Sequence, residues 1–122
     1  MYIWELPANL YDTTSLIDMN SNREFIDSLI NELISILTVI KEKITDDSDL
    51  IRTSYETPLE LRKEIDRCIY QLQQSHKDIL DEINFHFSPT GTFQEHSMAN
   101  GWTESYGAFA ARFDKLYESL NN

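Results

Sequence analysis

The stretch from Phe25 to Ile44 constrains the fold most, because its apolar residues recur at steps of three and four. At about 100° per residue, these positions cover close to half of a helix circumference. A stripe of this width needs cover from two neighbouring elements. It therefore predicts either the central helix of a bundle or a helix that shares its stripe with a second copy of the chain. The apolar positions are Phe25, Ile26, Leu29, Ile30, Leu33, Ile34, Ile36, Leu37, Ile40 and Ile44.

The start of this first helix is marked by a capping-box pattern. Ser21 can cap the free backbone amides while Glu24 reaches back, so we expect a helix over about residues 21–45. The N-terminal segment, residues 1–11, is short and aromatic and is closed by Pro7. We expect an extended N-terminal segment that lies over the bundle, with Tyr2 and Trp4 as anchors.

A second capping box opens the next helix, at Thr57 and Glu60, with Pro58 at the first helical position. Apolar positions follow at steps of three and four, so we expect one helix over about residues 57–88, ended by Pro89. Its stripe is Leu61, Ile65, Cys68, Ile69, Leu72, His76, Ile79, Leu80, Ile83 and Phe87.

The last helical pattern covers about residues 103–120, and a shorter one covers about residues 92–99. The chain has only three glycines and three prolines, which disfavours a turn-rich β fold. We therefore expect one all-α domain over residues 1–122. Its architecture is an antiparallel bundle of three main helices, with the short helical turn across one end.

The charge of the chain limits its partners. Its formal net charge is −11, so its surface repels nucleic acid and anionic membrane and attracts a basic protein. Cys68 is the single cysteine, so no intrachain disulfide forms, and the first residues lack the features of a signal peptide. These features predict a cytoplasmic protein that binds no nucleic acid and no membrane.

No catalytic or metal-binding motif is recognisable in the sequence. Cys68 lies on the second apolar stripe and is interpreted as a small core residue. His76 lies in the middle of the same stripe and is interpreted as a core histidine; the alternative is a ligand or a buried acid–base group. Glu82 and His86 are four residues apart, which is only half of a metal site. We expect no enzymatic activity, no cofactor and no metal.

Residues 88–102, SPTGTFQEHSMANGW, interrupt the helical patterns. Thr92 followed by Glu95 forms a further capping box, and Asn100–Gly101 favours a left-handed residue at the end of a short helix. The segment is either a structured corner, with Phe93 and Met98 pointing into the bundle, or a rigid binding surface. In the second case four polar side chains stay exposed: Gln94, Glu95, His96 and Asn100.

This segment and the helix after it resemble a pattern of small bacterial proteins of unknown function. The pattern is roughly F-x-PTG-x-hydrophobic-QE-x-S-x-x-NGW, followed by a helix that ends in L/F-A-x-x-FD. The resemblance covers about the last third of the chain, and Thr103 stands where the pattern often has glycine. Proteins of this size and type are similar to the immunity partners of bacterial toxins, which implies toxin binding and no catalytic residues. The matching residues are Phe87, Pro89, Thr90, Gly91, Gln94, Glu95, Ser97, Asn100, Gly101, Trp102, Ala110, Phe113 and Asp114.

The charge and the resemblance together favour a non-catalytic bacterial immunity or inhibitor protein that binds one cognate toxin tightly. A basic toxin such as a nuclease is the natural counterpart, because carboxylates can occupy the place of phosphates. The candidate contacts come from two segments: the acidic loop after the first helix, over residues 46–56, and the corner formed by residues 88–102. They are Asp46, Asp47, Asp49, Glu56, Gln94, Glu95, His96, Asn100 and Trp102.

Three other interpretations stay open. The first is a helical scaffold or adaptor that forms a homodimer through residues 25–44. The second is an enzyme that uses His76, His86 or His96 with nearby carboxylates. The third is a mimic of DNA, which requires acidic residues spaced like phosphates along one face.

Overall fold

The part of the chain that the structure describes is built from helices. The computed structural model describes the backbone of residues 7–121 and the side chains of residues 22–121. The elements are α1 (Pro7–Lys43), α2 (Pro58–Gln73), α3 (Ile79–Phe87), α4 (Thr92–Asn100) and α5 (Thr103–Leu120). The expected all-α class is confirmed. Among the described residues, no helix combines the length and the apolar character that crossing a membrane requires.

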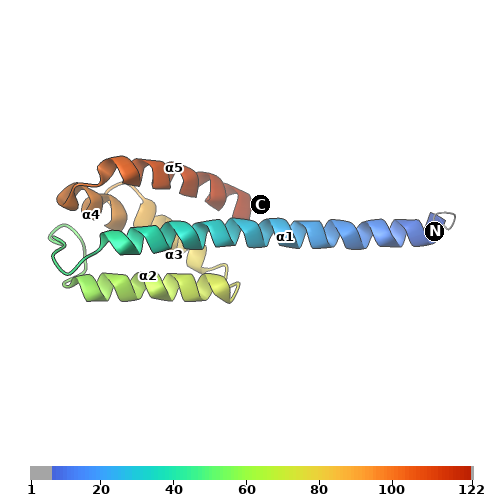
Figure 1. Cartoon of the computed structure of the whole chain (residues 1–122), viewed down its shortest axis with the longest axis horizontal. Coiled ribbons are helices and arrows are strands. Elements are labelled where there is room, and N and C mark those ends of the chain that lie inside the picture. Colours follow the sequence, from blue (N-terminus) through green and yellow to red (C-terminus); the bar gives the residue numbers. More distant parts are fainter. Residues whose placement is uncertain (1–6, 122) are drawn as a thin grey trace.

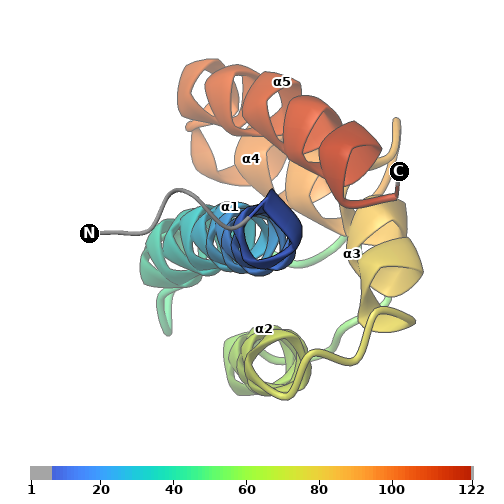
Figure 2. The ribbon, with the colours of Figure 1, turned by 90° about the vertical axis from the view of Figure 1, so that its right-hand side faces the viewer.

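α1 forms the axis of the bundle (Figure 1). α2 and α5 both run antiparallel to α1 and contact it, and α3 and α4 complete the bundle between them (Figure 2). α2 and α5 are therefore the two neighbours that the wide apolar stripe requires. The N-terminal part of α1 extends beyond the other helices (Figure 1).

α1 begins earlier than expected. The prediction of an extended segment is wrong for residues 7–11, and Ser21 lies inside the helix instead of capping it. Pro7 occupies the first helical position, where its missing N–H is not needed. No glycine or proline follows within α1, so nothing in the chain interrupts the helix. Tyr2 and Trp4 lie outside the described residues.

The second expected helix is in fact two helices. α2 starts as predicted: the Thr57 hydroxyl accepts a hydrogen bond from the backbone N–H of Glu60 at 3.2 Å, and Pro58 is the first helical residue. It ends at Gln73, because Ser75 adopts a left-handed conformation with φ of 60°. The prediction of one continuous helix over 57–88 is therefore wrong.

The break between α2 and α3 is closed by backbone hydrogen bonds. The N–H of His76 donates to the carbonyl of Gln71 at 3.0 Å, and the N–H of Ser75 donates to that of Leu72 at 3.0 Å. This is a Schellman motif, which usually carries glycine at the left-handed position. α3 then packs back against α2, so the apolar spacing on the two sides of the break does not belong to one helix.

An aromatic stack joins α3, α4 and α5. The ring of Phe87 stacks on Phe113 with centroids 4.4 Å apart and meets Phe93 edge-on at 5.0 Å. The Tyr106 hydroxyl donates to the Phe87 carbonyl at 2.9 Å, at the end of α3 just before Pro89. This stack fixes α3 and α4 beneath α5, and the predicted bounds of the last helix are confirmed.

Candidate functional site

The loop between α1 and α2, residues 44–57, is attached to the bundle at its start and in its middle. At its start, Arg62 of α2 donates to the Ile44 carbonyl at 3.1 Å and to the Asp46 carboxylate at 2.8 Å. In its middle, the Asn100 side chain pairs with the backbone of Asp49: Oδ1 accepts from the Asp49 N–H at 2.8 Å, and Nδ2 donates to the Asp49 carbonyl at 2.9 Å. Leu50 is buried beside this contact. A loop tethered in this way presents its outer side chains in fixed positions.

The exposed carboxylates of the acidic loop form two groups: two of them have a partner within the chain, and two have none among the described residues. Asp46, Asp47, Asp49 and Glu56 are all exposed. The Asp46 carboxylate is paired with Arg62 and the Asp49 carboxylate accepts the N–H of Ile51 at 2.9 Å. No hydrogen bond joins the carboxylates of Asp47 and Glu56 to any other described residue. Ile51, in the same loop, is 82% exposed, and the charge pattern of the chain gave no reason to single it out.

The corner from Ser88 to Trp102 is built by contacts within the chain. Thr90 adopts a left-handed conformation with φ of 60°, and its N–H donates to the Gln94 side chain at 2.9 Å. Gly91 lies so close to the preceding turn that a Cβ there would be 2.6 Å from the Phe85 carbonyl oxygen. Gly101 ends α4 with φ of 79°, as predicted.

Thr92 differs from its prediction. The residue before α4 is Gly91, and Thr92 is the first helical residue, so its hydroxyl does not cap the helix. Instead Thr92 is buried, and its Oγ1 lies 2.9 Å from Nδ1 of His86. Met98, which was expected in the core, is 55% exposed, whereas Phe93 is buried as expected.

His96 and Trp102 form a buried pair, which contradicts the expectation that they are exposed contacts for a partner. Trp102 Nε1 donates to Nδ1 of His96 at 2.9 Å, and both residues are buried. Nδ1 accepts, so Nε2 carries the proton, and Nε2 is buried without a partner among the described residues. Burial lowers the pKa of His96, and the nearby charge of Asp49 opposes that shift only in part. His96 is therefore a neutral core group.

The predicted site residues fall into two groups in the structure. Asp49 and Asn100 are brought together, because the Asn100 side chain holds the acidic loop against α4 through the Asp49 backbone. Gln94 and Glu95 are half-buried on α4, and the Gln94 side chain supports Thr90. The corner therefore positions the acidic loop and contributes few free side chains of its own.

A second cluster lies between α2 and α3, and the sequence did not predict it as a unit. It consists of Glu64 and Cys68 on α2 and His86 on α3. His86 Nε2 lies 3.0 Å from Glu64 Oε2, and Cys68 Sγ lies 3.7 Å from the same oxygen. The i, i+4 spacing of Glu64 and Cys68 places them on one helix face. His86 joins these two residues only because α3 folds back against α2, and no local pattern in the sequence predicts this packing.

Of the residues near this cluster, His76 differs from its prediction. His76, expected in the core, is exposed in the turn after α2, where its Nδ1 contacts the Gln71 side chain. Glu82 does not pair with His86; it accepts from Arg67, which also donates two hydrogen bonds to Glu64 at 2.9 and 3.0 Å.

The electrostatics of this cluster follow from its position. Burial and the nearby Glu64 carboxylate raise the pKa of the Cys68 thiol to about 12. Burial also acts to raise the pKa of Glu64, but hydrogen bonds from Arg67 and His86 outweigh it and hold that pKa below its usual value. Cys68 is thus a protonated, buried thiol at neutral pH, which is not the state of a nucleophilic cysteine.

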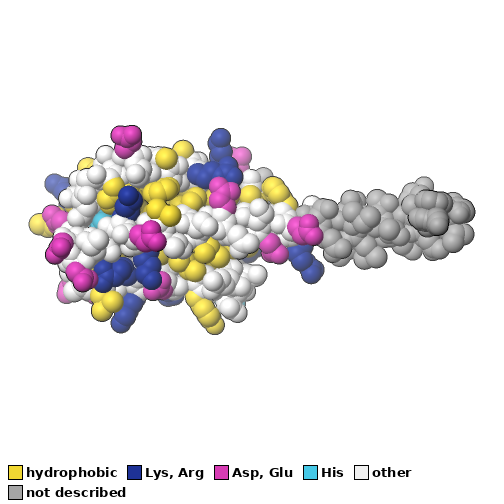
Figure 3. Space-filling model, in the orientation of Figure 1, with side chains coloured by type: hydrophobic (Ala, Val, Ile, Leu, Met, Phe, Trp, Pro, Cys, Tyr) yellow, Lys and Arg dark blue, Asp and Glu magenta, His cyan; other side chains and the backbone are white. Residues whose placement is uncertain are grey.

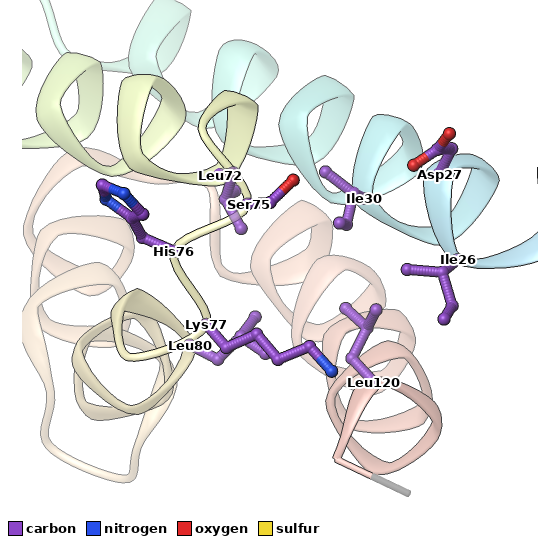
Figure 4. Close-up of a pocket in the computed structure, with 9 residues that line it drawn as sticks. All are labelled: Ile26, Asp27, Ile30, Leu72, Ser75, His76, Lys77, Leu80 and Leu120. Carbon is purple, nitrogen blue, oxygen red and sulfur yellow. The ribbon is translucent and has the colours of Figure 1, made fainter. Parts of the chain in front are cut away.

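A small apolar hollow lies where α1 leaves the bundle (Figure 4). Its volume is about 70 Å³, which is far below the roughly 300–1,000 Å³ of typical small-molecule sites. Phe25, 58% exposed, lies next in sequence to its rim residue Ile26. The hollow is lined by Ile26, Asp27, Ile30, Leu72, Ser75, His76, Lys77, Leu80 and Leu120.

Basic and acidic side chains alternate over the face drawn in Figure 3. Lys41 pairs with Asp66 at 2.7 Å and Arg62 pairs with Asp46 at 2.8 Å. This face therefore carries no continuous basic stripe of the kind that follows a phosphate backbone.

No family model matches this chain, and no curated protein and no solved structure matches it either.

Proposed function

We propose that this chain is a non-catalytic binding protein that recognises a basic protein through its acidic loop, and that it acts as an immunity protein neutralising a toxin. The observation that carries the proposal is the tethering of the loop 44–57. Arg62 holds its start and Asn100 holds its middle, while Asp47, Glu56 and Ile51 face solvent.

The tethered loop has the physical properties of a tight-binding surface. A loop that is already ordered loses little conformational freedom when it binds, and this lowers the cost of association. The exposed carboxylates accelerate the encounter with a basic surface. Ile51 can enter an apolar pocket of the partner, where a buried contact surrounded by polar groups contributes most to affinity.

The groups that could perform chemistry support a binding role. Cys68 and His96 are buried, and His96 is held by Trp102. His86 is buried and engaged by Glu64 and Thr92. The assignment to toxin immunity rests in addition on the resemblance of residues 87–114 to small bacterial proteins, and a basic nuclease-like toxin remains the expected partner.

Affinity capture with paired charge reversals tests the proposal. Tagged wild-type chain is expected to retain one basic protein, in a stoichiometric complex, from the cells that natively contain it. The variant Asp47→Lys/Glu56→Lys should lose that protein. The matched control Asp114→Lys/Glu118→Lys changes the net charge equally on the exposed surface of α5, and it should retain the protein. Equal retention by both variants would show that the loop is not the contact surface.

A homodimeric scaffold is the second candidate, and one observation bears on it. Most of the stripe over residues 25–44 is already buried within one chain, by α2 and α5. At its N-terminal end only Phe25 and Ile26 remain exposed, at 58% and 38%. A dimer would use that end of α1. Sedimentation across micromolar concentrations should show a single 14.3 kDa species if the immunity function alone applies, and a species of twice this mass if the scaffold is correct.

A further inference from the structure

The strongest arrangement of chemistry-bearing side chains outside the acidic loop is the cluster of Glu64, Cys68 and His86. The carboxylate, thiol and imidazole atoms all lie within 4.8 Å of one another. Cys68 is 1% exposed and His86 is 5% exposed, and Glu64 is half-buried. Three side chains of different ligand types thus meet at one position between α2 and α3 that is largely shielded from solvent.

The separations in the cluster are within a few tenths of an ångström of those between ligands around a tetrahedral metal. Zinc lies about 2.0–2.1 Å from imidazole nitrogen and about 2.3 Å from sulfur. For tetrahedral angles, these bond lengths place neighbouring ligand atoms roughly 3.3–3.7 Å apart. The observed separations from Glu64 Oε2 are 3.0 Å to His86 Nε2 and 3.7 Å to Cys68 Sγ. Small side-chain shifts would therefore suffice to admit the ion.

His86 is also supported in the manner of a metal ligand. Its other ring nitrogen, Nδ1, lies 2.9 Å from the buried Thr92 hydroxyl. A hydroxyl can donate or accept, so Thr92 can satisfy Nδ1 with or without a proton. When Nε2 binds a metal, the ring proton resides on Nδ1 and is donated to Thr92. Metal-bound histidines are commonly oriented by such a bond.

The charges around the cluster balance when a divalent ion is present. The Cys68 thiolate and the Glu64 carboxylate together neutralise the two positive charges. Arg67, which otherwise shares its donors between two carboxylates, keeps Glu82 as its partner. On binding, the Cys68 S–H proton passes to solvent, so each ion bound releases about one proton at neutral pH.

We propose that Glu64, Cys68 and His86 form a zinc site, with the fourth position open to water. The thiolate and imidazole favour Zn²⁺ or Co²⁺ over Mg²⁺ or Ca²⁺, which prefer oxygen ligands alone. The ion would link α2 to α3 and, through Thr92, would fix the start of α4. The ion would hold together the two helices that the left-handed residue at Ser75 separates.

Cobalt binding to the metal-stripped full chain tests this site. Co²⁺ should saturate at one ion per chain and give two optical signatures: visible d–d bands of tetrahedral strength and a near-ultraviolet thiolate-to-cobalt charge-transfer band. Zn²⁺ should displace the cobalt and abolish both signals. Because Cys68 is the only cysteine, the variant Cys68→Ser should lose the charge-transfer band completely. Wild-type protein without that band at saturating Co²⁺ would overturn the proposal, whatever the variants do.

Two further variants separate ligation from general effects on folding. Thr92→Val removes the hydroxyl that orients His86 but keeps the shape of the side chain, and it should weaken binding by about 10–100-fold. His76→Gln changes an exposed histidine outside the cluster and should leave the affinity unchanged. Circular dichroism confirms that each variant is helical before the titration. Equal affinities of wild type and Thr92→Val, or a loss of binding in His76→Gln, would contradict the assignment.

Discussion

Gly91 shows how a single side-chain atom decides the geometry of the corner. A Cβ at this position would lie 2.6 Å from the Phe85 carbonyl oxygen and 2.8 Å from that of Ser88, which are backbone atoms and cannot move freely. We expect Gly91→Ala to lower the free energy of unfolding by about 1–3 kcal/mol. Gly107→Ala is the matched control: nothing lies within 4 Å of its Cβ, so the variant should be stabilised by about 0.5–1 kcal/mol. Urea denaturation measures both, and a stable Gly91→Ala variant would contradict the described corner.

The buried pair of His96 and Trp102 makes the stability depend on pH. The pKa of His96 is lowered in the folded chain, whereas in the unfolded chain it lies at about 6.5. Below about pH 6.5 the unfolded state therefore binds a proton that the folded state rejects. The free energy of unfolding should fall as the pH drops from about 6.5 toward the folded pKa, by up to about 1.4 kcal/mol per pH unit.

Denaturation of two histidine variants between pH 7.5 and 5 checks this dependence. His96→Gln should lose this part of the pH dependence, because it removes the proton-binding group. His76→Gln should keep it, because His76 is exposed and lies outside the pair. A wild-type stability that stays constant over this range would show that His96 is not held neutral.

At the scale of residues, the sequence indicated which positions matter but not what they do. Asn100 and Gly101 were predicted to end a short helix, and they do. The burial of His96 could not be foreseen, because it depends on tertiary packing: its partner is Trp102, at the start of the next helix, and the charge of Asp49, about fifty residues earlier, acts on it. Polarity alone placed His96 on the surface.

At the scale of elements, the break between α2 and α3 has a direct test at Ser75. A left-handed conformation costs an L-residue about 1–2 kcal/mol, which glycine avoids. Ser75 is exposed, so we expect Ser75→Gly to raise the free energy of unfolding by about 1 kcal/mol. In a continuous helix the same change would be destabilising by about 1 kcal/mol. The sign of the change in thermal denaturation therefore distinguishes the two folds.

The hydrogen bonds that tether the acidic loop to α4 give a second test at the level of structural elements. Asn100→Ala removes both side-chain hydrogen bonds to the Asp49 backbone. We expect amide exchange at Asp49 and Ile51 to accelerate, while exchange in α5 stays slow, because the loop opens without unfolding the bundle. Asn31→Ala, on the exposed side of α1, is the matched control and should leave the loop unchanged. Unchanged exchange in Asn100→Ala would show that the loop is held by other contacts.

Element boundaries were predictable where local chemistry sets them. The Thr57 cap and Pro58 define the start of α2 by local contacts, as expected, although the Glu60 carboxylate accepts from the Thr57 hydroxyl and not from its backbone N–H. The end of α2 was missed, because its left-handed residue is Ser75 and not glycine. The start of α1 was missed because a capping pattern at Ser21 says nothing about whether the helix continues before it.

At the scale of the whole molecule, the packing of the interior was more predictable than the positions of the candidate sites. Its interior is filled by the stripe of α1 and the aromatic stack around Phe87. The class of fold followed from the periodicity of these residues alone. The positions of the acidic loop and of the cluster around Glu64 did not, because both depend on contacts between segments distant in sequence.

The central claim is that the tethered acidic loop, and not the overall charge, meets the partner. The most direct test is the association rate of the captured partner with wild type and with Asp47→Lys/Glu56→Lys, measured at low and high salt. We expect the association rate of Asp47→Lys/Glu56→Lys to be lower by roughly tenfold or more at low salt, a difference that shrinks as salt screens the charges, and no comparable reduction in Asp114→Lys/Glu118→Lys. Equal rates for the two double variants at every salt concentration would contradict it.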